Sequence, residues 1–367
     1  MFHIFGYEIS IIQIVLTVFG IGIVIFIHEL GHFLLAKKFG LKVEKFAFGF
    51  GREIFGFTRG ETRYSINIFP AGGYVKMPGE DIDSASGDPR EFLSAAWYKR
   101  LIIAAAGPVM NYVLALVLFT VLFHYWGLPV ASNQPIIGEI IEGRPAQAAG
   151  LKPGDTIISI NSSPVKSWDE IPALISSQSG QKLKLQIERD NAKFFVSITP
   201  LKDASSGRGL IGIGPKTESE KMGALQSVEL SSKFIVFQSY MTLKVLGSAV
   251  IRRQAPEIAG PIGVINLIAK SAKLGIDKFI YLIGIISVAL GLFNLLPIPL
   301  VDGGHIMMSI IEFVTRRPLN KLAVRVANYI GLALILVIFV YATYSDIHRM
   351  DVTGFVLKIG RHVGLIK

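Results

Sequence analysis

The feature that most constrains this sequence is an apolar run that leads directly into a pair of histidines. Residues 10–27 contain no charged side chain, residues 28–32 read HELGH, and the run ends at Lys37 and Lys38. Because about 20 helical residues cross the roughly 30 Å hydrocarbon core of a bilayer, the run predicts a membrane-spanning helix. Ionisable groups inside such a helix are costly and persist mainly where they act, so we expect this helix to carry the functional site.

His28 and His32 lie one turn apart on that helix and project from the same face, where both imidazoles can bind one zinc ion. Zinc lowers the pKa of its water towards neutrality, and the carboxylate of Glu29 can take the proton as hydroxide attacks a peptide carbonyl. The alternative, two histidines that meet by chance, leaves costly groups in the bilayer unexplained. The spacing therefore predicts zinc-dependent hydrolysis.

Composition agrees with an integral membrane protein that carries a soluble part. Of the 367 residues, 51% are hydrophobic and 24 are Phe, and the mean hydropathy is +0.51. The net charge of +10 is interpreted as a mark of cytoplasmic loops, and we predict no nucleic-acid partner. The chain has no Cys, which excludes disulfides and thiolate chemistry. No basic region precedes the first apolar run, so it is expected to be a retained helix and not a signal peptide.

Four segments are long and apolar enough to cross a membrane: residues 10–33, 101–126, 279–296 and 322–344. Six basic residues flank the loop between the first two: Lys37, Lys38, Lys42, Lys45, Lys99 and Arg100. By the positive-inside rule this loop is cytoplasmic, and the HELGH motif lies towards the cytoplasmic side. Residues 231–253 are interpreted as an interfacial amphipathic helix, because a further crossing would separate Asp302 from His28 by about 30 Å. Residues 260–263, GPIG, are interpreted as a turn before the third span.

The cytoplasmic loop is rich in Phe and Gly between residues 46 and 77, and residues 62–68 alternate in the manner of a strand. We expect membrane-associated β-hairpins beside the first helix, with their hydrogen bonds satisfied within the protein. An exposed strand edge can hold a substrate extended by β-augmentation, whereas the alternative is a cap that only packs. Residues 81–90 are polar and are interpreted as a connection.

The soluble part extends from residue 127 to about residue 216. Strands are expected at residues 136–141, 156–160, 183–188 and 194–199, and a helix at residues 167–177. Residues 143–155, GRPAQAAGLKPGD, resemble the core of a bacterial protease-associated PDZ domain. That resemblance implies a groove for a peptide ligand on the outer face, with a size-excluding plug or spacer as the alternative role.

A third metal ligand is expected after the third span, where residues 294–305 read NLLPIPLVDGGH. The prolines end the helix, and the glycines free the backbone so that Asp302 can turn towards the first span. A catalytic zinc ion takes three protein ligands. Asp302 is our choice for the third ligand, and His305 is the alternative. Asn294 lies about two turns earlier, where its amide can hold a substrate backbone.

The second span contains a polar side chain, Asn111, shortly after Gly107 and Pro108. A buried amide needs a partner, which the metal site can supply. An equally favoured role for this region is helix packing, because small side chains at residues 104–107 let helices approach closely.

These motifs, in this order, resemble the site-2 protease family of intramembrane zinc metalloproteases, and within it the bacterial regulator-of-sigma-E branch. The matching elements are HExxH at residues 28–32, GPxxN at residues 107–111, a PDZ insertion, and NxxPxPxxDG at residues 294–303. The resemblance implies cleavage of single-pass membrane proteins, such as anti-sigma factors or remnant signal peptides, in the bacterial inner membrane. It also implies the following roles: zinc ligands His28, His32 and Asp302; catalytic base Glu29; substrate contacts Asn294, Asn111 and Pro297.

The expected fold is a polytopic α-helical membrane protein with about four spans, a membrane-associated cytoplasmic β-hairpin region and one inserted α+β PDZ-like domain. Its segments are the zinc helix 1–39, the hairpin loop 40–98, the second span 99–126, the PDZ-like domain 127–216, an interfacial segment 217–278, the third span 279–304, the fourth region 305–345 and a basic tail 346–367. The best-known family members have two PDZ domains where this chain has room for one, and Val301 replaces the usual Leu.

Two other classes of function were weighed. A transporter would use the histidines and carboxylates as an ion or proton relay, but the spans show no internal repeat. A membrane-anchored PDZ scaffold would leave the polar groups of residues 28–32 unexplained. Loss of cleavage with zinc retained in Glu29→Gln would support the protease, whereas unchanged function would favour the scaffold.

Overall fold

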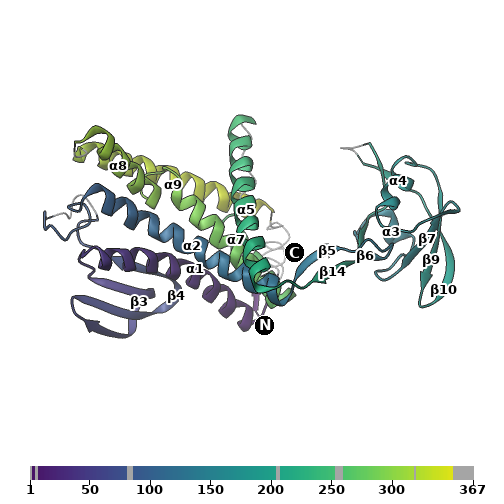
Figure 1. Cartoon of the computed structure of the whole chain (residues 1–367), viewed down its shortest axis with the longest axis horizontal. Coiled ribbons are helices and arrows are strands. Elements are labelled where there is room, and N and C mark those ends of the chain that lie inside the picture. The colour runs from purple at the N-terminus through teal and green to yellow at the C-terminus, as the bar shows by residue number, and fades with distance from the viewer. Residues whose placement is uncertain are drawn as a thin grey trace, which may run out of the picture. The chain divides into compact units, whose positions relative to one another are not determined.

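The computed structural model describes residues 2–4, 7–80, 86–203, 207–252, 259–317 and 320–349. The chain divides into two compact units, one formed by residues 1–122 and 224–367 and the other by residues 123–223. Figure 1 shows the helices of the first unit and the strands of the second. The first unit contains every residue expected at the zinc site.

The first unit is built mainly from seven described helices. They are α1 (Ile11–Lys38), α2 (Trp97–Tyr125), α5 (Ala224–Arg252), α6 (Pro261–Leu274), α7 (Ile276–Leu295), α8 (Asp302–Thr315) and α9 (Lys321–Arg349). Among the described residues, four helices are long and apolar enough to cross a membrane, namely α1, α2, α7 and α9. They coincide with the four segments expected from the sequence. A short pair, β1 (Phe2–Ile4) and β2 (Tyr7–Ile9), precedes α1.

Close contact between α1 and α2 depends on the absence of side chains. A Cβ added to Gly31 would lie 2.4 Å from the carbonyl oxygen of Ala106, so a larger residue would push the two helices apart. Small residues at such crossings let helix backbones approach closely in membranes. This contact brings the HELGH motif of α1 against the first half of α2.

The segment expected to be interfacial contains two helices and not one helix followed by a turn. The expected turn around residues 260–263 is the start of α6, which packs on α1 through Ile268 and Val24. Asp346 accepts hydrogen bonds from the backbone N–H groups of Gly260 and Gly263, at 2.9 and 2.7 Å. Asp346 therefore belongs to α9 and not to a tail, and residues 350–367 of the expected tail lie outside the described residues.

The loop after α1 forms two long strands, β3 (Lys45–Arg59) and β4 (Thr62–Lys76), which lie along α1 in Figure 1. Residues 45–48 pair with residues 73–76 and also with residues 63–66, whereas residues 55–59 pair with residues 62–66. Each strand therefore bends and supplies two segments, so that residues 73–76 form one edge of the sheet. The left-handed backbone at Gly49, with a φ of 87°, permits one of these bends.

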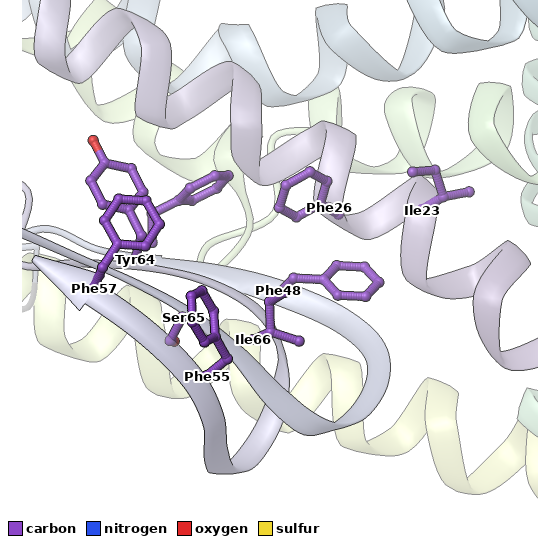
Figure 2. A pocket seen from close by; sticks show the side chains of 9 residues that line it. Ile23, Phe26, Phe48, Phe55, Phe57, Tyr64, Ser65 and Ile66 are labelled. Carbon is purple, nitrogen blue, oxygen red and sulfur yellow. The ribbon is translucent and has the colours of Figure 1, made fainter.

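An apolar cavity of about 410 Å³ lies between α1 and the bent hairpin (Figure 2). Ile23 and Phe26 of α1 line one side, and aromatic side chains of the hairpin such as Phe48 and Phe57 line the rest. Further apolar side chains, including Ile54 and Phe55, are more than half exposed. This surface fits the expectation that the hairpin contacts lipid.

The second unit is the expected α+β insertion. Its elements are β5 (Leu128–Ala131), β6 (Ile137–Ile140), α3 (Pro145–Ala148), β7 (Thr156–Ile160), β8 (Ser163–Pro164), α4 (Glu170–Ser176), β9 (Leu183–Arg189), β10 (Ala192–Ile198), β11 (Leu201–Lys202), β12 (Gly209–Leu210), β13 (Ile213–Pro215) and β14 (Thr217–Glu220). A four-stranded sheet in the order β10-β9-β7-β8 packs its apolar face into a single core that includes Ile157, Leu185 and Ile187. The four expected strands and the expected helix are present with small shifts at their ends.

Candidate metal centre

The structure brings together three residues that are far apart in the sequence. His28 and His32 of α1 are buried, and their Nε2 atoms lie 3.2 Å apart. Asp302, the first residue of α8, places Oδ2 3.1 Å from Nε2 of His28 and Oδ1 3.4 Å from Nε2 of His32. One ligand atom from each residue lies within 4.8 Å of the others. His305 is not part of this group, because its ring packs edge-on against Phe92 at 5.4 Å.

The other ring nitrogens show how the two imidazoles are oriented. Nδ1 of His32 lies 2.8 Å from the carbonyl oxygen of Ile103, and a carbonyl only accepts, so this Nδ1 carries the hydrogen. Nε2 of His32 is then left with a free lone pair. A backbone carbonyl of α2 thus fixes the tautomer that a metal ligand needs.

His28 is held in the same way by a side chain of α2. Its Nδ1 lies 3.1 Å from Nδ2 of Asn111, while the fully buried Oδ1 of Asn111 has no hydrogen-bond partner in the described residues. The two ends of an amide are assigned from their hydrogen bonds, and turning this amide over lets Oδ1 accept from Nδ1–H of His28. That orientation satisfies both groups. It also leaves Nε2 of His28 with a free lone pair, like that of His32.

Three hydrogen-bond acceptors therefore converge with no hydrogen between them. They are the two imidazole Nε2 atoms and the carboxylate of Asp302, whose buried Oδ2 has no hydrogen-bond partner in the described part of the chain. Lone pairs at this distance repel one another, and a cation placed among them removes the repulsion. Two imidazoles and one carboxylate are a ligand set of catalytic zinc. The residues present therefore fit a zinc ion.

Gly107 of α2 makes room for the two rings. A Cβ at this position would lie 2.2 Å from Nε2 of His32 and 2.7 Å from Cε1 of His28. Real Cβ atoms do not approach so closely, so any larger residue would displace the imidazoles. The GPxxN motif at residues 107–111 thus supplies space at one end and a hydrogen-bond partner for His28 at the other.

Glu29 lies at the boundary between α1 and the sheet. Its Oε2 accepts a hydrogen bond of 3.0 Å from the backbone N–H of Val75, in the edge segment 73–76 of β4. Asn294, near the end of α7, places Nδ2 3.4 Å from Nε2 of His28. Pro297 is exposed in the turn that follows α7. Glu29 and Asn294 therefore stand at the rim of the ligand group, and the fully buried Asn111 stands behind it.

One acidic residue near the site was not expected from the sequence. Glu80 follows β4, and burial among protein atoms raises its pKa to about 7, with further influence from the charges of His32 and Glu29. Glu80 nevertheless keeps an exposed surface. The available sequence signal was its position directly after the Pro78-Gly79 turn at the end of a predicted strand.

The comparisons with known proteins identify the class. A family model described as peptidase family M50 matches residues 16–338. A relative from Clostridium acetobutylicum whose name includes the words zinc metalloprotease is 35% identical over 92% of this chain and 98% of its own length. The regulator of sigma-W protease RasP of Bacillus subtilis is 28% identical over 90% of this chain and 96% of its own length. The chain belongs to peptidase family M50.

A solved structure is also similar to part of the chain. The PDZ domain of an SdrC-like protein from Listeria innocua matches 23% of this chain and 93% of that domain, at 27% identity and a TM-score of 0.21.

The predicted family and the predicted class, a zinc metalloprotease of the membrane, are confirmed by the family model and the relatives.

Proposed function

We propose that this protein hydrolyses peptide bonds within the membrane-spanning segments of single-pass membrane proteins, with His28, His32 and Asp302 as its zinc ligands and Glu29 as its base. The observation that carries the proposal is the convergence of three acceptors, two of them imidazoles on α1, a helix long enough to span a membrane, and the third the carboxylate at the start of α8. With both imidazoles neutral, such a group needs a cation to offset the repulsion among its lone pairs. The membership in peptidase family M50 agrees with the chemistry.

The surrounding residues suit peptide hydrolysis. When bound, zinc polarises the substrate carbonyl and lowers the pKa of water. Glu29 accepts the proton of the attacking water, and the Val75 N–H holds its carboxylate in place beside the histidines. Asn294 offers an amide to the substrate backbone at the same rim. Asn111 is buried at 0% exposure, so its part is to orient His28, which differs from the direct substrate contact expected from the sequence.

The sheet edge supports an extended substrate. Residues 73–76 pair with residues 45–48 on one side only, and Val75 in that segment contacts Glu29. A peptide added to this edge would run past the proposed base in an extended form, in which its carbonyl groups are free of helical hydrogen bonds. Unwinding of the substrate helix and cleavage would then occur at one place.

The orientation follows from charge, as the sequence predicted. We place the protein in the bacterial inner membrane with the metal centre towards the cytoplasm and the soluble unit outside. The soluble unit, which we propose to be PDZ-like, would bind a peptide end or exclude large outer domains. The relative named as a regulator of sigma-W protease favours anti-sigma factors among the substrates, with remnant signal peptides as a second class.

The test is co-expression with single-pass membrane proteins that are shortened on their outer side. We expect a cut inside the membrane segment that Glu29→Gln abolishes while the purified variant keeps its zinc. Glu229→Gln, in an exposed ion pair of α5, is the matched control and should cleave normally. Unchanged cleavage by Glu29→Gln would contradict the proposal, and binding of outer peptide ends without any Glu29-dependent step would favour a scaffold.

A further inference from the structure

The helix that begins with Asp302 is tied to α2 by an ion pair near its far end. Arg100 at the start of α2 forms a hydrogen-bonded ion pair with Glu312 in the last turns of α8. Next to it, the rings of Trp97 and Phe313 pack with centroids 4.4 Å apart. Ten residues separate Glu312 from Asp302, which is about 15 Å along a helix, so the pair cannot touch the metal site.

The near end of α8 is under backbone strain. Leu300, two residues before Asp302, has a φ of 83°, a conformation that a bulky side chain adopts only when its surroundings enforce it. The next residues pack very tightly, because a Cβ on Gly303 would lie 1.8 Å from the carbonyl oxygen of Leu296. This turn would relax if α8 were free to shift. Contacts farther along α8 can add to those of the turn in keeping it in place.

We infer that the Arg100–Glu312 ion pair is the positioning contact that seats α8 and thereby holds the carboxylate of Asp302 against His28 and His32. The two residues act through Asp302 and not on the substrate. The inference rests on the proposed zinc site, since it explains how one of the three ligands is delivered.

Burial explains why this pair has the necessary strength. The side chain of Arg100 is 9% exposed and that of Glu312 is 25% exposed, and Nη2 of Arg100 makes the bond, while its Nε has no hydrogen-bond partner among the described residues. When one partner of a buried pair is removed, a charge is left uncompensated, and the structure must move to solvate it. The movement open to α8 is away from α2. Because α8 is a rigid helix, that movement carries Asp302 with it.

The platform on the α2 side is itself fixed. Phe92, which packs on His305 of α8, donates its backbone N–H to the carbonyl oxygen of Pro78 at 3.0 Å. The segment that receives α8 is therefore tied to the end of β4, close to the edge that contacts Glu29. The helix that carries the ligand Asp302 and the proposed base Glu29 are thus both connected to β4.

The experiment measures zinc retention by the purified full-length protein at increasing chelator concentration, together with its melting temperature without metal. We expect Glu312→Gln and Arg100→Gln each to lose half of their zinc at about tenfold lower chelator than the wild type, the lower end of the loss seen when a group bonded directly to a metal ligand is removed. The charge swap Arg100→Glu with Glu312→Arg should restore retention. Glu229→Gln, from the exposed pair with Lys233, should behave as the wild type.

The outcomes separate this inference from the proposed function. If the wild type retains no zinc, the proposed function fails. If the wild type retains zinc and Glu312→Gln retains it equally well, with or without a lower melting temperature, the pair only stabilises the fold and the inference is wrong. Glu312→Asp keeps the charge with a shorter reach, and it takes the place of any single variant that fails to fold. For that variant, retention equal to the wild type at an unchanged melting temperature contradicts the inference.

Discussion

Two aspartates, one in each unit, have opposite surroundings. Asp155 in the soluble unit is fully buried and fully paired, with Arg189 Nε at 2.6 Å, Arg189 Nη2 at 2.8 Å and the Lys152 N–H at 2.8 Å. Asp302 in the membrane unit instead faces two imidazole lone pairs, and its Oδ2 lacks a partner in the described residues. A paired buried carboxylate stabilises a fold, whereas an unpaired one indicates a group that is absent from the polypeptide. The surroundings alone therefore indicate a structural role for Asp155 and a ligand role for Asp302.

The largest expected effect is at Asp302. Asp302→Asn removes one of the three zinc ligands, so zinc should be lost on dialysis and the cleavage rate should fall by more than about 100-fold. The metal-free variant should melt at or above the temperature of the metal-free wild type, because an unpaired buried carboxylate has been removed. Metal analysis and thermal melting check both parts. If Asp302→Asn kept its zinc, Asp302 would not be a zinc ligand, and the contrast with Asp155 would be wrong.

The converse change is Asp155→Asn. Removal of the charge leaves Arg189 without its partner, and the free energy of unfolding of the soluble unit should fall by about 3–5 kcal/mol. Zinc content at temperatures below melting should stay at the wild-type value. Chemical denaturation of the purified chain, followed by a probe in the soluble unit, measures the loss. No loss of stability would show that the pair is dispensable.

Gly107→Ala tests whether the space beside His28 and His32 is needed for zinc binding. The new Cβ would overlap the two imidazoles, and we expect about tenfold weaker zinc retention. The loss of free energy of unfolding should be smaller than that of Asp155→Asn. Gly247 in α5 has no atom within 4 Å of an added Cβ, so Gly247→Ala is the matched control. That control should leave zinc unchanged and raise helix stability by about 0.5–1 kcal/mol. Equal zinc retention in both variants would show that zinc binding does not depend on the space at Gly107.

Asn111 allows a finer test of how His28 is oriented. Asn111→Ala should weaken zinc retention by roughly tenfold or more, because Nδ1–H of His28 loses its acceptor. Asn111→Asp keeps an oxygen acceptor and should retain zinc better than the alanine variant. The reverse order would mean that Asn111 donates to His28, and the assignment of the imidazole lone pairs would then be wrong.

The smallest expected effect is on acid stability. Burial alone would raise the pKa of Asp155, but the hydrogen bonds from Arg189 and the Lys152 N–H outweigh it and lower that pKa. A lowered carboxyl pKa contributes stability above its unfolded value of about 3.9, and this contribution is lost as the pH falls through the folded value. Between about pH 5 and pH 2 the wild type should therefore lose more stability than Asp155→Asn. Parallel curves would contradict the assignment.

Helical periodicity and apolar length are local properties, and they were enough to predict the four spans and the shared face of His28 and His32. The strands of the soluble unit followed from alternation for the same reason. The choice of Asp302 over His305 was left open by the residues alone, because it depends on how α8 packs. The structure settles their positions by turning His305 towards Phe92.

Other features were beyond reach of the sequence because they depend on contacts between distant segments. The start of α6 was interpreted as a turn, since Gly260 and Pro261 suggest one and only Asp346, 86 residues away from Gly260, caps the helix there. The double register of β3 and β4 depends on bends that alternation does not encode. Asn111 was identified as polar and buried, but its partner could not be chosen before α1 and α2 were placed together.

The most direct test of the account is X-ray absorption at the zinc edge of the purified wild-type protein. We expect two imidazole nitrogens at about 2.0–2.1 Å and a carboxylate oxygen at about 2.0–2.2 Å from the metal, and we expect His32→Ala to lose its zinc as Asp302→Asn does. A bound metal with fewer than two imidazole ligands, or a wild-type protein that takes up no divalent metal, would contradict it.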